Sequence, residues 1–117
     1  MNDIGPQLTI GVEEEYLLVD KDTRALVVDP PDGLMQDCEQ RLGIQVSTEL
    51  LQSQVEIGTK VCSNVREVRD ELIRLRGNIK EVANSYGLEP IAASTHPFSS
   101  WHEQKATPKE RYDRLTV

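Results

Sequence analysis

The chain has 117 residues, of which 38% are apolar and 28% charged, and this is the size and composition of one globular domain. It contains no apolar run long enough to cross a membrane and no basic region followed by an apolar stretch at its N-terminus, so neither a membrane span nor a signal peptide is expected. A net charge of −7 argues against general nucleic-acid binding, which needs a clustered positive surface. The two cysteines are too few for a disulfide scaffold or a zinc knuckle. These features predict a soluble cytoplasmic protein.

The first predicted element is a strand over residues 8–20, which is rich in β-branched and aromatic residues. Successive strand residues point to opposite faces, so Glu13 and Glu15 share one face. The other face carries Leu8, Ile10, Val12, Glu14, Tyr16 and Leu18. A polar turn over 20–24 then leads to a returning strand over 25–29, which two prolines end.

The middle of the chain predicts a short helix over 34–42, a strand-like segment over 44–59 and a long helix over 65–86. Apolar residues of the long helix recur in alternating steps of three and four: Val65, Val68, Leu72, Leu75, Ile79, Val82 and Tyr86. Asn64 and Glu67 have the form of a capping box, and Gly87 suits a left-handed C-terminal cap. We expect this helix to bury one face against a sheet.

The last third of the chain predicts a strand over 89–95, a loop over 99–107 and a final helix. That helix would start at Pro108, with Thr107 as its N-cap, and would bury only Tyr112 and Leu115 before the sequence stops at Val117. A helix of about two turns is marginal in isolation. The sequence is therefore expected to be part of a longer protein.

The paired glutamates of the first strand are the first candidate for chemistry. Glu13 and Glu15 lie about 7 Å apart along a strand, and hard oxygen ligands at such a spacing can bracket Mg²⁺ or Mn²⁺. The alternative is a solvated strand face, since charges on edge strands are a common protection against aggregation.

A second acidic position lies in the segment over 44–59. Glu56 shares a polar face with Gln52 and Gln54, and it would complete a three-carboxylate site if this segment lay beside the first strand. Glu49 has the opposite parity, so it could join the site only through a bulge or from the start of the strand. His96 follows a predicted strand, where functional residues often gather, although a structural histidine is the simpler alternative.

Several segments in this order resemble one family of enzymes. They are TIGVEEEYLLVD over 9–20, QVEIGT over 54–59, STHPF over 94–98 with Trp101, and the pair Arg111–Tyr112. Together they resemble the carboxylate–amine ligases, also called type 2 glutamate–cysteine ligases. The resemblance implies an α+β, glutamine-synthetase-like fold, in which helices pack on one face of a curved, mainly antiparallel sheet. Residues 1–117 would be the N-terminal portion of a single ligase catalytic domain.

The resemblance also implies an activity that depends on ATP and Mg²⁺, with Mn²⁺ as a substitute. Glutamate would be activated as an acyl phosphate, and cysteine or another amine would displace phosphate to form an amide, as in γ-glutamylcysteine. The implied partners are these small molecules, without nucleic acid or membrane. A homo-oligomer is compatible with the sequence, because an unpaired sheet edge favours self-association.

Individual residues match the family's motif positions. The metal carboxylates correspond to Glu13, Glu15 and Glu56, with Glu49 as a further, less regular candidate, while Glu14 is not expected to be a ligand. His96 and Arg111 are the candidates for catalytic or substrate-binding roles. Two alternatives stay open at this stage: a non-catalytic metal- or ligand-binding fragment that is inactive without a C-terminal part, and a folded remnant without activity.

Overall fold

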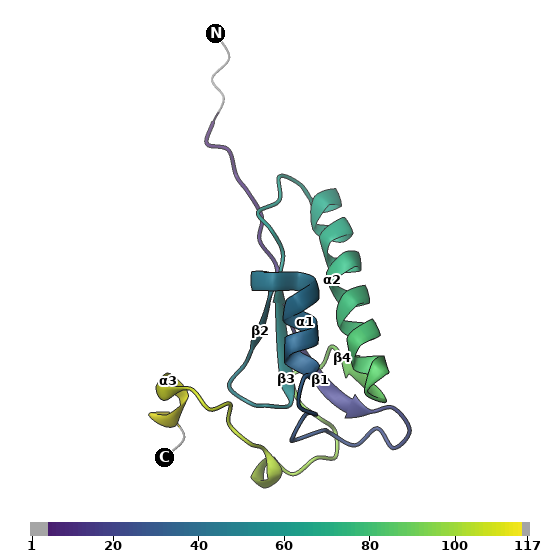
Figure 1. Ribbon diagram of the computed structural model, residues 1–117. Helices are drawn as coiled ribbons and strands as arrows, with labels where there is room; N and C mark the ends of the chain where they lie inside the picture. The colour runs from purple at the N-terminus through teal and green to yellow at the C-terminus, as the bar shows by residue number, and fades with distance from the viewer. Residues whose placement is uncertain (1–4, 116–117) are drawn as a thin grey trace.

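The computed structural model of the protein describes residues 5–115. Helices and strands are mixed along the chain (Figure 1). Their order is β1 (Glu13–Asp20), α1 (Leu34–Leu42), the 3-10 turn η1 (Gly43–Gln45), β2 (Val46–Thr48), β3 (Gln54–Gly58), α2 (Val65–Ser85), β4 (Leu88–Ile91), the 3-10 turn η2 (Trp101–Glu103) and α3 (Glu110–Asp113). This mixture of elements confirms the predicted α+β class. Over the described range, no helix combines the length and apolarity that a membrane span requires.

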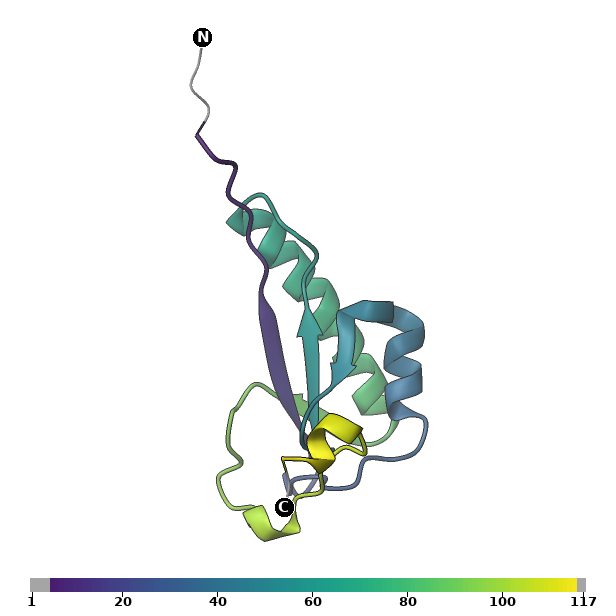
Figure 2. The same cartoon turned by 90° about the vertical axis from the view of Figure 1, so that its left-hand side faces the viewer.

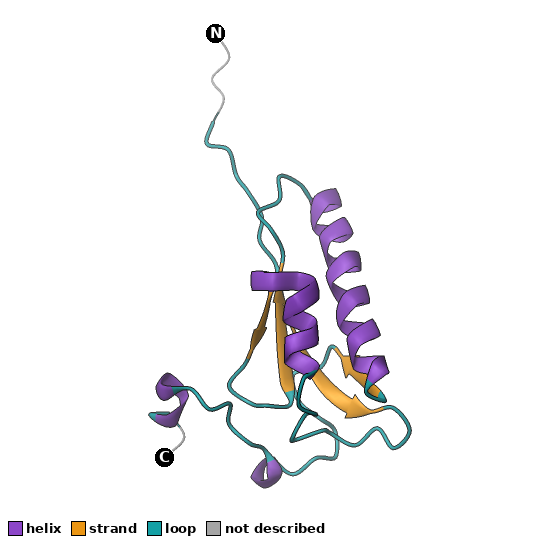
Figure 3. Ribbon diagram, in the orientation of Figure 1, coloured by secondary structure: helices purple, strands orange, loops and turns teal. Residues whose placement is uncertain are grey.

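Within residues 5–115, four strands form one antiparallel sheet in the order β2-β3-β1-β4. Helices α1 and α2 lie side by side on one face of this sheet (Figure 3). Figure 2 looks onto the other face, with α2 behind the strands and α3 in front of their lower ends. Helices therefore cover one face of the sheet. The opposite face, which we call the open face, is not covered by α1 or α2.

The core lies between the sheet and the two longer helices. It consists of Tyr16, Leu18, Leu34, Cys38, Leu42, Val46, Val55, Ile57, Leu75, Ile79, Val82, Ala83 and Leu88. The long helix is confirmed, and it begins where predicted, because the Asn64 side chain accepts a hydrogen bond of 2.9 Å from the Glu67 N–H. The prediction that Val65 belongs to the buried apolar face of this helix is wrong. Val65 is 74% exposed, since the first turns of α2 extend beyond the sheet (Figure 1).

The segment over 44–59 differs from its prediction as a single strand. It forms a hairpin in which β2 and β3 pair, with Val46 opposite Ile57 and Thr48 opposite Val55, and residues 49–53 make the turn between them. The returning strand predicted over 25–29 is also wrong. It is reduced to one bridge between Val19 and Leu26, because β3 already pairs with the same edge of β1 as far as Leu17.

Both ends of the chain are less regular than predicted. The first strand begins at Glu13 instead of residue 8, and of the described residues before it, 5–12, Ile10 forms an isolated bridge with Cys62. The strand predicted over 89–95 is the shorter β4. The final helix has Lys109 as its N-cap, so Thr107 does not cap it, and the predicted continuation to 116–117 lies outside the described residues.

The two cysteines, Cys38 and Cys62, are free and buried, so they form no disulfide scaffold. Cys38 is 1% exposed and Cys62 is not exposed at all. Burial raises the pKa of the Cys38 thiol to about 11, so this thiol is protonated at neutral pH. A buried, protonated thiol is a poor nucleophile, so we assign Cys38 to packing; Cys62 is assigned to packing on its complete burial.

A carboxylate of α2 is buried beside the segment that follows β3. Glu71 of α2 is 8% exposed, and its carboxylate accepts hydrogen bonds from the Lys60 N–H at 3.1 Å, from the Gln45 side-chain amide at 2.9 Å and from Arg74 at 3.2 Å. The Lys60 N–H, followed by Gln45 and Arg74, holds the pKa of this carboxyl below its ordinary value. Glu71 therefore ties α2 to η1 and to the segment after β3.

Removal of this carboxylate should destabilise the fold. We expect Glu71→Ala to lower the free energy of unfolding by about 1–3 kcal/mol, because donors that face it lose their acceptor. Its folded pKa is lowered, so its contribution is present above the ordinary pKa and lost as the pH falls through the folded value. Urea unfolding at pH 7 and pH 4 measures both effects. Glu81→Gln, which removes an exposed ion pair with Arg41, is the control and should change stability by less than about 0.5 kcal/mol.

Candidate metal centre

The open face of the sheet carries a row of polar side chains that the strand register aligns. Glu15 of β1 lies opposite Glu56 of β3, and Ser47 of β2 lies opposite Glu56 on its other side. Two residues along the strands, Glu13 lies opposite Gly58. Two carboxylates from neighbouring strands are therefore brought side by side, away from the helices.

Three carboxylates converge in this row. Glu15, Glu49 and Glu56 each offer one carboxylate oxygen, and these three oxygens lie within 4.8 Å of one another. Ser47 pairs with Glu56, so Glu49, two residues after Ser47, follows on the same face; the hairpin thereby removes the parity conflict that a single strand would have given. Carboxylate oxygens in such a group are the ligands that Mg²⁺ and Mn²⁺ prefer.

The electrostatics of the cluster favour a bound cation. The pKa of Glu56 is raised to about 7, first by a hydrogen bond with Glu49, then by partial burial, and then by the negative charges of Glu49, Glu13 and Glu15. Like charges at this separation disfavour full ionisation. A divalent cation would relieve the same repulsion, so the residues present fit a metal ion.

The three consecutive glutamates of β1 have different surroundings. Glu13 lies outside the group of three, although its charge acts on Glu56. Glu14 points to the helix side, where it accepts hydrogen bonds from the Tyr16 hydroxyl at 2.7 Å and from Arg76 of α2 at 3.0 Å. Arg76 holds the pKa of Glu14 below its ordinary value. Glu14 is thus a contact between β1 and α2.

His96 does not lie in the cluster. It is 8% exposed in the loop after β4, where its Nε2 lies 2.8 Å from the Arg24 carbonyl oxygen. A carbonyl can only accept, so Nε2 carries the proton and Nδ1 accepts from the N–H groups of Phe98 and Ser99, at 3.3 and 3.1 Å. Main-chain groups therefore occupy both ring nitrogens, and His96 holds this loop against the turn after β1.

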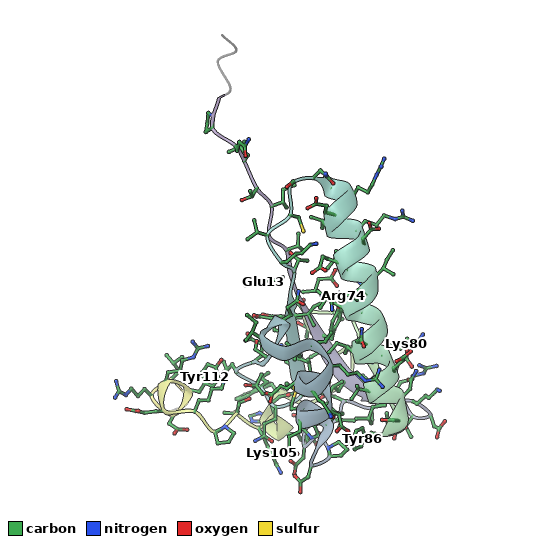
Figure 4. The ribbon with its side chains drawn as sticks, turned by 45° about the horizontal axis from the view of Figure 1, so that its top comes forward. Glu13, Arg74, Lys80, Tyr86, Lys105 and Tyr112 are labelled. Carbon is green, nitrogen blue, oxygen red and sulfur yellow. The ribbon has the colours of Figure 1, made fainter. Side chains whose placement is uncertain are left out.

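Arg111, unlike His96, interacts electrostatically with two carboxylates of the cluster. Its guanidinium stacks 4.6 Å from the centre of the Tyr112 ring, and Nη2 donates a 2.6 Å hydrogen bond to the Tyr112 hydroxyl. Tyr112, and after it the charges of Glu49 and Glu56, raise the pKa of Arg111. Figure 4 shows Tyr112 on α3, to one side of the strand that carries Glu13. Arg111 thus adds positive charge beside a negative cluster.

Comparison with known proteins identifies the family of this chain. A model of the glutamate–cysteine ligase family 2 matches residues 9–117. The chain belongs to this family. A protein of Rhodospirillum rubrum named "Putative glutamate--cysteine ligase 2" is 50% identical over 114 residues, which cover 94% of this chain and 29% of that protein. Proteins with the same name from Jannaschia sp. and Chloroflexus aggregans are 48% and 42% identical, over 92% and 99% of this chain.

The match to glutamate–cysteine ligase family 2 has a limited extent. The chain spans 28–29% of the length of these three relatives. The matched range contains all of the candidate residues: Glu13, Glu15, Glu49, Glu56, His96 and Arg111. The family resemblance seen in the sequence is therefore confirmed.

In this glutamate–cysteine ligase family 2 chain, the sequence did not predict the contact between residues 104–107 and the turn of the hairpin. Residues 104–107, predicted as loop and helix cap, pair with the turn that carries Glu49, through a bridge between Leu51 and Ala106. The Gln52 N–H donates to the Lys105 carbonyl at 2.8 Å, and the Thr107 N–H donates to the Leu50 carbonyl at 2.8 Å. No local pattern could have indicated a contact between residues more than 50 positions apart.

Proposed function

We propose that this chain is the N-terminal part of an ATP- and Mg²⁺-dependent carboxylate–amine ligase. In the full-length protein the side-chain carboxylate of glutamate would be activated as an acyl phosphate, and the amine of cysteine or a related compound would form the amide. The observation that carries the proposal is the convergence of Glu15, Glu49 and Glu56 on the open face of the sheet, in a chain of glutamate–cysteine ligase family 2.

Each candidate residue has a role in this proposal. Glu15, Glu49 and Glu56 would hold Mg²⁺ or Mn²⁺, and Glu13 would add negative charge beside them. The bound ion would neutralise phosphate charge during phosphoryl transfer. Arg111 supplies positive charge close to the cluster, where an anionic group of a substrate would be attracted. His96 has both ring nitrogens engaged, so we assign it to loop positioning instead of proton transfer.

The 117-residue chain alone should bind the metal without forming an amide. It spans less than a third of its relatives, and we expect the rest of the nucleotide and substrate sites to come from the remaining length. We therefore expect saturable Mn²⁺ binding by calorimetry, and no ATP-dependent γ-glutamylcysteine above a no-protein control. A full-length protein of the family is the positive control in the same assay.

Two outcomes would change this assignment. Amide formation by the purified chain would show that the site is already complete within it. A full-length protein that binds Mn²⁺ but joins no carboxylate to any amine tested would favour the alternative function, a non-catalytic metal-binding module.

A further inference from the structure

The three carboxylates of the cluster are not held equally well. Glu15 and Glu56 lie on paired strands, so the hydrogen bonds of the sheet fix their main chains. Glu49 lies just beyond β2, in the turn over 49–53. Its carboxylate accepts a local hydrogen bond of 3.2 Å from the N–H of Leu50 and shares a hydrogen bond with Glu56, but neither contact fixes the main chain of the turn. Something outside the sheet must therefore hold Glu49 in place.

The segment that follows η2 provides this support. This segment covers residues 104–107. The hydroxyl of Thr107 donates a hydrogen bond to the main-chain carbonyl of Glu49. Its N–H donates a second one, of 2.8 Å, to the carbonyl of Leu50. Thr107 is 7% exposed, so these bonds are largely shielded from water. Two successive carbonyls are thus bound by one residue, which fixes both the position and the direction of the turn.

We propose that Thr107 is a positioning residue, which holds Glu49 where its carboxylate can bind the metal together with Glu15 and Glu56. This inference rests on the proposed function, because it concerns the same carboxylate cluster. Partners that orient metal ligands are worth about 10- to 100-fold in metal affinity. A buried hydroxyl that binds the main chain of a ligand residue acts in the same way, by limiting the positions that the ligand can adopt.

The first test is a double-mutant cycle with Mn²⁺ alone as the probe. Thr107→Val keeps the shape of the side chain and removes its hydroxyl, so we expect Mn²⁺ affinity to fall about 10-fold, while Thr107→Ser retains affinity within about 3-fold. In a Glu49→Gln background, Thr107→Val should change affinity by less than about 2-fold, because its effect passes through Glu49.

A matched variant separates positioning from a general loss of stability. Ser53 is fully buried in the same turn, and its hydroxyl donates a 2.9 Å hydrogen bond to the Gln104 side chain, whereas that of Thr107 donates to the Glu49 carbonyl. Ser53→Ala should lower the melting temperature to a similar extent as Thr107→Val, yet keep Mn²⁺ affinity within about 2-fold. Equal losses of affinity in both variants would overturn the inference.

A second measurement needs no mutation and applies even if Thr107→Val fails to fold. Linkage is reciprocal, so if these hydrogen bonds favour metal binding, the metal must stabilise them to the same extent. Saturating Mg²⁺ should therefore slow hydrogen exchange at the N–H groups of Thr107 and Gln52 about 10-fold. Unchanged exchange with bound metal, or undiminished Mn²⁺ affinity in Thr107→Val, overturns this inference alone. Absence of saturable Mn²⁺ binding in the wild-type chain overturns the proposed function and this inference together.

Discussion

Replacement of Glu15, Glu49 or Glu56 by glutamine should abolish most of the metal-dependent function. We expect each change to weaken Mn²⁺ binding strongly and to lower amide formation by the full-length protein by at least ~10²-fold, the scale of losing one preorganised electrostatic contact. The metal-free chain should keep or gain thermal stability, because one of three crowded negative charges is removed. Calorimetric Mn²⁺ titration and thermal unfolding measure the two effects on the same samples.

Neighbouring glutamates of β1 provide the controls for this series. Glu14→Gln should keep Mn²⁺ affinity and lose some stability, because it weakens the contact with Arg76 and Tyr16 on the helix side. Glu13→Gln should have a smaller effect than Glu15→Gln, since Glu13 acts on the cluster through its charge alone. If Glu14→Gln lost Mn²⁺ binding while Glu15→Gln retained it, the assignment of the two strand faces would be wrong.

Mn²⁺ affinity should also depend steeply on pH. The pKa of Glu56 is raised to about 7, chiefly by its hydrogen bond with Glu49, so a proton must leave before the metal binds below that pH. We therefore expect affinity to fall roughly tenfold for each pH unit below 7, or about 100-fold between pH 7 and pH 5. Titrations across this range measure the slope. Glu49→Gln, which removes the largest cause of the raised pKa, should shift the onset of the fall to lower pH.

Stability of the metal-free chain should follow the opposite course. Because the folded pKa of Glu56 lies above its ordinary value of 4.5, the stability that its proton contributes is fully present below pH 4.5 and lost as the pH rises through about 7. Saturating Mg²⁺ should raise the melting temperature at pH 8 and leave it almost unchanged at pH 4.5. A melting temperature with the same Mg²⁺ response at both pH values would contradict the assignment of this cluster as the metal site.

Much of the fold follows from local patterns in the sequence. The apolar repeat of α2, its cap at Asn64 and the alternation along β1 are properties of short segments, so they are visible without any knowledge of tertiary contacts. For the same reason the sequence separates Glu14 from Glu13 and Glu15. These local features predicted which face of the sheet would carry the acidic residues.

Contacts between distant segments could not be predicted in this way. The apolar markers over 44–59 fit one strand or a hairpin equally well, and the choice depends on pairing with β1, which lies more than 30 positions away. The inclusion of Glu49 in the cluster depends on that hairpin turn and on Thr107, 58 positions further along the chain. Tertiary pairing thus decides the membership of the site, whereas periodicity decides only its face.

The alternation of side chains at Glu14, Glu15 and Tyr16 has a consequence for how the protein can change over time. Selection for folding would act on Glu14 and Tyr16, which contact Arg76 and the core, whereas in the proposed metal site selection for cation affinity would act on Glu15 between them. A substitution at Glu15 can therefore retune or erase the chemistry while the scaffold persists. Descendants of such a chain could lose activity early and still be inherited as well-folded proteins, available for another use.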